Sequence, residues 1–296
     1  MSLDLALQYL VAGLTYGAIY VVVAIGFNIV YSATGIINFA QGEFVMLGGM
    51  TSVQLARFLP LPLAVAAAVA ITAAVGALVE VAFIRWLWKP SVLRMVVITI
   101  GVSILMREAA LFLWGESVRS LPYFTGNEVS SVALAGARIS PQVFWVLGTV
   151  ALIVGALEWF YRRTLLGWEM RACAANKDAA SLCGVPVRRL VTLSFGLAAA
   201  IGALAGAVVS PITYTSYAAG GPLAIKGFTV AILGGLGNSG GAVAAGLALG
   251  IVESFTVSVL PAAYKDVVTL SLLLAVLVVR PSGLFVSGEA ARLREF

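Results

Sequence analysis

Long apolar segments recur along the whole chain and limit what it can fold into. Eight of them approach the roughly 20 residues that a helix needs to cross the hydrocarbon core of a membrane. Hydrophobic residues make up 61% of the 296 residues and charged residues only 10%, against about 25% charged in ordinary soluble chains. The sequence therefore predicts an all-α, polytopic membrane bundle, a single transmembrane domain of residues 1–296, with eight spans at residues 5–31, 36–56, 63–84, 95–114, 143–160, 190–209, 241–260 and 267–279.

Two points of topology stay open. A ninth apolar stretch at residues 228–236 is short and flanked by glycine, so residues 228–240 either cross the membrane or enter it and return. The N-terminal segment lacks the basic region and small-residue cleavage site of a signal peptide, and we expect it to remain as the first span. The side on which the N-terminus lies depends on whether the ninth stretch is counted.

Positive charge orients the spans. Twelve Lys and Arg residues fall in one set of connections and the C-terminal tail, whereas five, including Lys226, fall in the other set. Because cytoplasmic loops carry the excess of positive charge, we place the first set and the C-terminus in the cytoplasm. The net charge of +5 comes from residues scattered among apolar spans, without the basic stripe of a nucleic-acid-binding protein.

One connection on each side has a pattern of its own. The exterior loop of residues 115–141 contains β-branched residues around a central Ala-Gly-Ala, which suits a small β-hairpin, with an ordinary ordered loop as the alternative. In the cytoplasmic loop of residues 161–189, the segment 169–182 has no glycine or proline and predicts a helix. Its small-residue face suits docking against another protein, and resting on lipid head groups is the alternative.

Polar side chains interrupt the second apolar segment. Asn38, Gln41 and Glu43 lie within "INFAQGEF", soon after Asn28, and an unpaired polar group in hydrocarbon costs several kcal/mol. We interpret this break as part of a translocation pathway or a subunit seam. A second break, "GGLGNSGG", carries Asn238; paired interrupted segments indicate a pathway in transporters, although a tight turn is the alternative.

Ionisable residues also lie inside spans. Glu253 is in the middle of one and is a candidate for the pathway by default, whereas bonding to a neighbouring helix is the structural alternative. Arg107 and Glu108 either pair with other spans or extend to the interface. The chain has no histidine and no convincing spacing of a nucleophile and a base, which argues against an intramembrane enzyme and a metal site.

Four motifs in order resemble one family of transport proteins. They are "GLTYGAIYVVVAIGFNIVYSATGIINFAQGEFVMLGG" at 13–49, "GWEMRACAANKDAASLCGV" at 167–185, "GFTVAILGGLGNSGGAVAAG" at 227–246 and "RPSGLF" at 280–285. Together they resemble the LivH-type permease subunit of branched-chain amino-acid ABC importers. Where the family pattern reads "NFAHG", this chain has Gln41 in the histidine position. Related urea and short-chain amide permeases share much of the pattern and stay an alternative, as does an ion-coupled secondary carrier.

The resemblance implies a pore-forming subunit of the bacterial inner membrane that is not itself an enzyme. Its expected partners are a second, LivM-like permease or another copy, two cytoplasmic ATPase subunits, a periplasmic substrate-binding protein and membrane lipid. ATP and Mg²⁺ would bind to the ATPases, and no cofactor would bind to this chain. The chain contains no phosphate-binding motif G-x-x-x-x-G-K-[ST]. The resemblance makes the 161–189 loop the ATPase-coupling element, with candidate residues Glu169, Arg171, Ala172, Ala175, Asn176, Asp178, Ala179 and Gly184.

Overall fold

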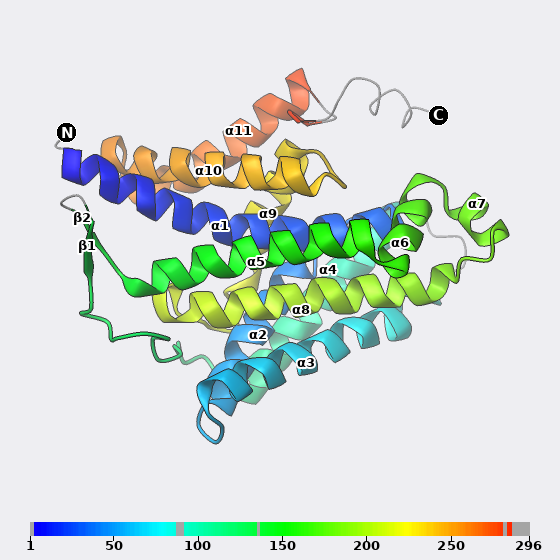
Figure 1. The fold of residues 1–296 in the computed structure, drawn as a ribbon, viewed down its shortest axis with the longest axis horizontal. Helices are drawn as coiled ribbons and strands as arrows, with labels where there is room; N and C mark the ends of the chain where they lie inside the picture. Colours follow the sequence, from blue (N-terminus) through cyan, green and yellow to red (C-terminus); the bar gives the residue numbers. More distant parts are fainter. Residues whose placement is uncertain (1–2, 87–91, 135–136, 281–282, 286–296) are drawn as a thin grey trace.

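The computed structural model describes residues 3–86, 92–134, 137–280 and 283–285, and these are helical almost throughout (Figure 1). In chain order the elements are α1 Leu3–Thr34, α2 Gln41–Leu55, α3 Leu61–Val79, the π-helix η1 Glu80–Ile84, α4 Val92–Trp114, β1 Val132–Leu134, β2 Ala137–Ile139, α5 Pro141–Arg163, α6 Leu165–Ala175, α7 Lys177–Leu182, α8 Val187–Thr213, α9 Gly220–Gly234, α10 Ser239–Val259, the 3-10 turn η2 Ala262–Tyr264 and α11 Lys265–Val279.

The helical bundle expected from composition is confirmed. Within the described residues, seven helical segments are long and apolar enough to cross a membrane, and they correspond to α1, α3 with η1, α4, α5, α8, α10 and α11 with η2. Their ends agree with the apolar runs to within a few residues. The core consists mainly of aliphatic side chains from α1 and α8, whose spans are the most buried of the seven.

Two apolar segments form short helices. The expected span at residues 36–56 is wrong in its first turn, since α2 starts only at Gln41 and has 15 residues. At 1.5 Å per residue such a helix is about 22 Å long, less than the roughly 30 Å of a hydrocarbon core. The segment begins late because Gly35 ends α1 with φ +71°, and the Asn38 side chain accepts from the Ala40 amide at 3.1 Å. The ninth stretch belongs to α9, which also has 15 residues.

Helices α1–α4 and α8–α11 repeat one arrangement. Each set has a long helix, a six-residue connection (35–40 and 214–219), a 15-residue helix and then two further helices. Each long helix packs along the third helix of the other set, α1 on α10 and α8 on α3. The chain runs along α1 and α8 in opposite directions (Figure 1), so the two sets form an inverted repeat of the kind found in many transporters.

Glycines spaced four residues apart allow α1 and α10 to pack closely. A β-carbon placed on Gly13 would lie 2.7 Å from the Ile251 Cα, and one on Gly17 would lie 2.7 Å from the Gly246 carbonyl oxygen. No real β-carbon fits at such distances, so the two backbones are in direct contact. Helix association in lipid relies on this kind of packing because the lipid tails remove the hydrophobic driving force.

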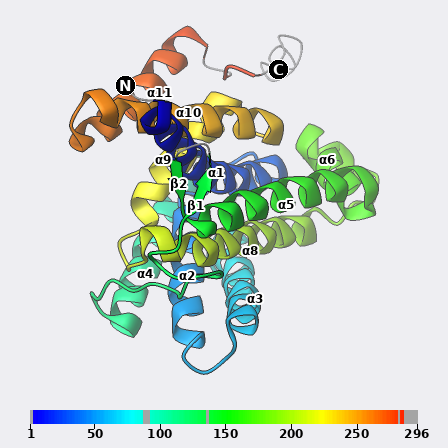
Figure 2. The same ribbon diagram turned by 60° about the vertical axis from the view of Figure 1, so that its left-hand side comes forward.

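The two ends of the bundle differ. Strands β1 and β2 pair antiparallel, with Val132 opposite Ile139, and residues 135–136 between them lie outside the described residues. This two-stranded element lies at the end where α1 starts, whereas α6 and α7 lie at the opposite end (Figure 1; Figure 2 shows the same bundle turned). The loops that the sequence places on opposite sides of the membrane are therefore at opposite ends of the molecule.

Candidate functional site

The two short helices start against each other inside the bundle. A β-carbon on Gly42 would overlap the carbonyl oxygen of Gly220 and lie 2.8 Å from the Ala224 amide nitrogen. A β-carbon on Gly220 would in turn overlap the Glu43 carboxylate. The first turns of α2 and α9, each with amide groups lacking helical partners, thus meet around one acidic side chain.

Glu43 is the acidic side chain at this meeting point, and it is 1% exposed. Its Oε1 accepts a hydrogen bond from the Ser103 hydroxyl of α4 at 3.0 Å. Its Oε2 has no hydrogen-bond partner in the described structure. The position in the first turn of α2 favours a carboxylate, because the helix N-terminus carries partial positive charge. Arg107 follows Ser103 by one turn of α4, so a basic residue lies on the same side of that helix.

Two further polar groups before Glu43 are only partly satisfied. The Gln41 amide nitrogen donates to the Ala198 carbonyl of α8 at 3.1 Å, while its Oε1 has no partner within the described residues. The Asn38 Nδ2 is likewise buried without a partner among them. Most buried polar atoms in native proteins are hydrogen-bonded. Three neighbouring exceptions at the start of one short helix therefore single out this position.

Asn28 and Asn238 belong to the other break. The Asn28 side chain accepts from the Gly237 amide at 3.0 Å and donates to the Asn238 carbonyl at 3.3 Å, which ties α1 to the turn between α9 and α10. The Asn238 side chain caps α10 by accepting from the Gly241 amide at 3.0 Å and donates to the Phe285 carbonyl at 3.1 Å. Asn28 therefore faces the second break, whereas Asn38, Gln41 and Glu43 occupy the first.

Glu253 forms a third polar cluster, which joins four helices. It is 1% exposed and accepts from the Tyr20 hydroxyl at 2.7 Å, from the Lys226 ammonium at 2.8 Å and from the Thr269 hydroxyl. Lys226 also lies 3.0 Å from Asp266. Assigning Lys226 to an exterior connection was wrong, because α9 starts at Gly220 and holds it inside the bundle. Its lone positive charge after "GGPLAI" did not reveal a partner 27 residues away.

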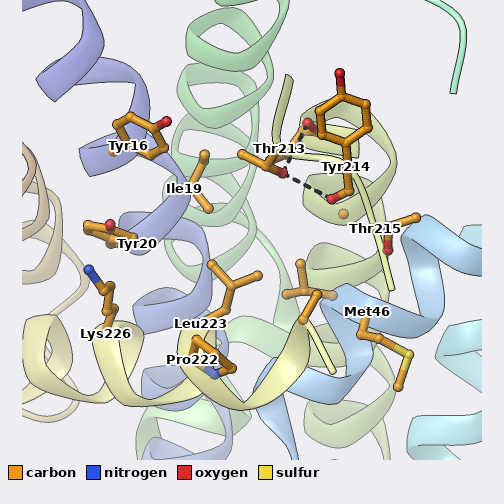
Figure 3. A pocket seen from close by; sticks show the side chains of 14 residues that line it. Tyr16, Ile19, Tyr20, Met46, Thr213, Tyr214, Thr215, Pro222, Leu223 and Lys226 are labelled. Carbon is orange, nitrogen blue, oxygen red and sulfur yellow. Dashed lines mark hydrogen bonds between the residues drawn. The ribbon is translucent and has the colours of Figure 1, made fainter. Parts of the chain in front are cut away.

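A cavity of about 200 Å³ lies beside this cluster, between α1, α2, α8 and α9. Figure 3 shows Tyr16, Tyr20 and Lys226 on one side of it and Thr213–Thr215 on the other. Aliphatic side chains line the space between them, namely Ile19, Val45, Val209 and Leu223. The arrangement suits a small molecule with an apolar body and a polar head.

The loop at the opposite end contains two helices instead of one. The continuous helix expected over 169–182 is wrong at Asn176, which is extended and accepts from the Ala179 amide at 2.9 Å to cap α7. Gly184 adopts φ +84° after α7, the left-handed conformation that glycine commonly takes just past the end of a helix. Of the candidate coupling residues Glu169 is half-buried, and the exposed ones are Arg171, Ala172, Ala175, Asn176, Asp178, Ala179 and Gly184.

Large apolar side chains on α6 are exposed as well, namely Leu165, Leu166 and Trp168. The alanine pattern alone did not draw attention to them. One polar contact links this region to the first break: Lys177 of α7 donates to the carbonyl oxygen of Thr34, the last residue of α1. Burial lowers the pKa of Lys177 below its usual value.

The part of the chain that the structure describes has seven helices able to cross a membrane, two short helices that meet at a buried carboxylate and an inverted repeat. These features define the class of a multi-pass transport protein. Residues 9–277 match the family described as "Branched-chain amino acid transport system / permease component". The chain therefore belongs to this permease family, and the resemblance noted in the sequence is confirmed.

Named relatives agree with the family. The chain is 35% identical to the high-affinity branched-chain amino acid transport system permease protein BraD of Pseudomonas aeruginosa, over 94% of this chain and 95% of BraD. It is 34% identical to the permease protein LivH of Escherichia coli, over 94% of each chain. Identity to the probable LivH of Methanocaldococcus jannaschii is 24%, over 95% of this chain and 93% of the relative. No solved structure matches.

Proposed function

We propose that this chain is the permease subunit of an ATP-driven importer of branched-chain amino acids. The observation that carries the proposal is the family match over residues 9–277, together with relatives whose names specify that transport system. Substrate would arrive from a periplasmic substrate-binding protein at the end that carries β1 and β2. It would leave at the end that carries α6 and α7, in the bacterial inner membrane with the basic loops and the C-terminus in the cytoplasm.

The energy would come from two ATPase subunits that bind ATP and Mg²⁺, while this chain binds no cofactor. The 161–189 loop is the proposed ATPase-docking element, since its helices α6 and α7 carry the exposed Ala175, Ala179 and Leu182. Lys177 would pass movement of this loop to the end of α1, because it binds the Thr34 carbonyl directly before the first break. The six-residue connection 35–40 and the first turn of α2 then lie between Thr34 and Glu43.

A second permease, LivM-like or another copy, would cover the outward face of α4. Arg107 and Glu108 pair at 3.5 Å on this helix, with side chains 42% and 54% exposed. Charged groups inside a span almost always face protein or water and not lipid. Exposed apolar neighbours on the same helix, Ile104, Leu105 and Phe112, supply a surface that lipid or a partner helix could cover, and the charged pair favours the partner.

The pathway would pass between α4 and the start of α2. Glu43 reaches α4 through Ser103, and its unpaired Oε2 would be available to a hydrated path. The unpaired atoms of Asn38 and Gln41 would be further polar groups of the same break. Asn28 and Asn238 would hold the second break in shape. Glu253 would anchor α9 through Lys226.

Transport by a reconstituted complex tests this proposal. Liposomes that contain this chain, a second permease and the ATPases, with receptor outside and ATP inside, should accumulate radiolabelled leucine. Omission of ATP should abolish the uptake. Uphill uptake by this chain alone on an ion gradient would show a secondary carrier instead, and ATP-driven uptake of urea but not leucine would show an amide-type permease.

A further inference from the structure

The cavity between the two repeats has the size and lining of a binding site for one small molecule. Its volume of about 200 Å³ is below the roughly 300–1,000 Å³ of pockets for drug-sized ligands. The body of the cavity is lined by Ile19, Val45, Val209 and Leu223, contributed by four different helices. A ligand there would contact both repeats at once, so its binding would depend on how they are arranged.

Charge is balanced at one end of the cavity. Lys226 lies 2.8 Å from Glu253 and 3.0 Å from Asp266, and Lys265 stacks 4.9 Å from the ring centre of Tyr16. Two positive and two negative groups leave no net charge for a singly charged ligand to neutralise. A zwitterion, which carries one charge of each sign on neighbouring atoms, matches this environment.

Lys226 is able to exchange one of its two carboxylate partners. Glu253 is 1% exposed and held by Tyr20 and Thr269, so its pairing with Lys226 is fixed. The Asp266 side chain is 75% exposed, and ion pairs with such exposed groups contribute only about 0–1 kcal/mol. A ligand carboxylate could replace Asp266 on the Lys226 ammonium without leaving a buried charge unpaired.

The other end of the cavity is closed by a strained segment. Among the described residues Tyr214 is the only non-glycine with positive φ, at 59°, and its hydroxyl donates to Glu128 of the exterior loop at 3.1 Å. The neighbouring Thr215 exchanges backbone hydrogen bonds of 2.9 and 2.7 Å with Arg119 of the same loop. Strained non-glycine residues cluster at ligand clamps and switches. This end therefore faces the side on which a receptor would deliver substrate.

We propose that this cavity holds one aliphatic amino acid during transport, with its side chain among Ile19, Val45 and Leu223 and its carboxylate on Lys226. The inference rests on the proposed import of such amino acids and assigns them a site within a single permease chain. The aliphatic lining selects the side chain, and the charged end selects the zwitterionic head (Figure 3).

Protection of a cavity cysteine tests the site without transport. The exposed Thr213 at the cavity wall is replaced by cysteine in a Cys173→Ser, Cys183→Ser background, and its labelling by a small methanethiosulfonate is followed in detergent. Leucine should slow labelling in a concentration-dependent way, whereas acetate and isobutylamine, which each carry one charge, should not. Val129→Cys, in the exterior loop and 88% exposed, is the matched control and should show no protection.

Two variants assign the protection to the proposed contacts. The double change Lys226→Met, Glu253→Gln removes both buried charges together and should raise the protecting leucine concentration at least tenfold. Leu223→Phe leaves the charges intact but fills the cavity, and it should also raise the protecting leucine concentration. In this variant valine should protect better than leucine. The site would be overturned if neither variant raised the protecting leucine concentration, if acetate protected as well as leucine, or if leucine protected Val129→Cys. Leucine uptake by the wild-type complex without protection would overturn this site alone, whereas protection without uptake would overturn only the transport proposal.

Discussion

Replacing Gly17 by alanine should weaken the bundle by a predictable amount. The new β-carbon would lie 2.7 Å from the Gly246 carbonyl oxygen and 2.9 Å from the Leu247 Cα, while carbon atoms pack best at about 3.5 Å or more. The helices α1 and α10 must therefore separate by about 0.6 Å, and a gap of this size forfeits about a quarter to a half of each contact along the seam. Overpacking of this kind costs about 1–3 kcal/mol.

Gly155→Ala is the matched control. Gly155 lies inside α5, and a β-carbon there would meet nothing within 4 Å. Both changes gain the same helix propensity, about 0.5–1 kcal/mol, so the difference between the two variants isolates the cost of overpacking. We expect Gly155→Ala to match or slightly exceed the wild type and Gly17→Ala to be less stable than Gly155→Ala by about 1–3 kcal/mol.

The chain supplies its own reporter of unfolding. Cys173 is buried and Cys183 is exposed, so in a Cys183→Ser background a thiol-reactive fluorophore labels the protein only when the structure opens. Heating the detergent-solubilised variants with the dye gives the unfolding midpoints. Equal midpoints for Gly17→Ala and Gly155→Ala would refute the direct backbone contact between α1 and α10.

Four further changes test the proposed function. Ala175→Arg places a charged side chain on the exposed face of α6 and should abolish co-purification of the ATPase while the unfolding midpoint stays unchanged; normal co-purification would contradict the docking surface. Lys177→Met removes the contact with α1 and should lower leucine transported per ATP hydrolysed several-fold, measured in one set of liposomes; an unchanged ratio would exclude this coupling route. Glu43→Ala should reduce uptake although the complex still assembles, and full uptake would leave Glu43 a structural role. Ile104→Cys, 48% exposed on α4, should cross-link to the second permease in membranes, whereas cross-linking at Leu152→Cys of α5 instead would move the seam.

Hydropathy located the long helices because a span must be apolar over its whole length. Hydropathy failed at the first break because the features that end the helix there are local. Residues 36–40 are apolar enough to extend the following helix, and only the local bonds of Asn38 and the left-handed Gly35 show that they do not. The break at Asn176 escaped notice in the same way, because one side chain caps a new helix there.

The candidate site was only partly visible in the sequence. The polar run of Asn38, Gln41 and Glu43 stood out because it interrupts an apolar stretch. Lys226 did not stand out, since its partner Glu253 belongs to a different helix and is brought close by tertiary packing alone. The close contact between Gly42 and Gly220, at the starts of α2 and α9, likewise joins residues far apart in the sequence. The two halves of such an inverted repeat share a structure, although their sequences need not be similar.

The order of synthesis gives α2 an unusual problem during biogenesis. Its close partner is α8, against which Gly48 packs on Ala203 and Gly206 packs on Val45, but α8 begins only at Val187. At about 5–20 residues per second, a ribosome needs on the order of ten seconds to make the intervening chain. During that time the Gln41 amide, which donates to Ala198 of α8 in the finished structure, has no partner, and the short segment is a poor candidate for release into lipid. We expect α2 to wait at the insertion machinery until the second repeat arrives.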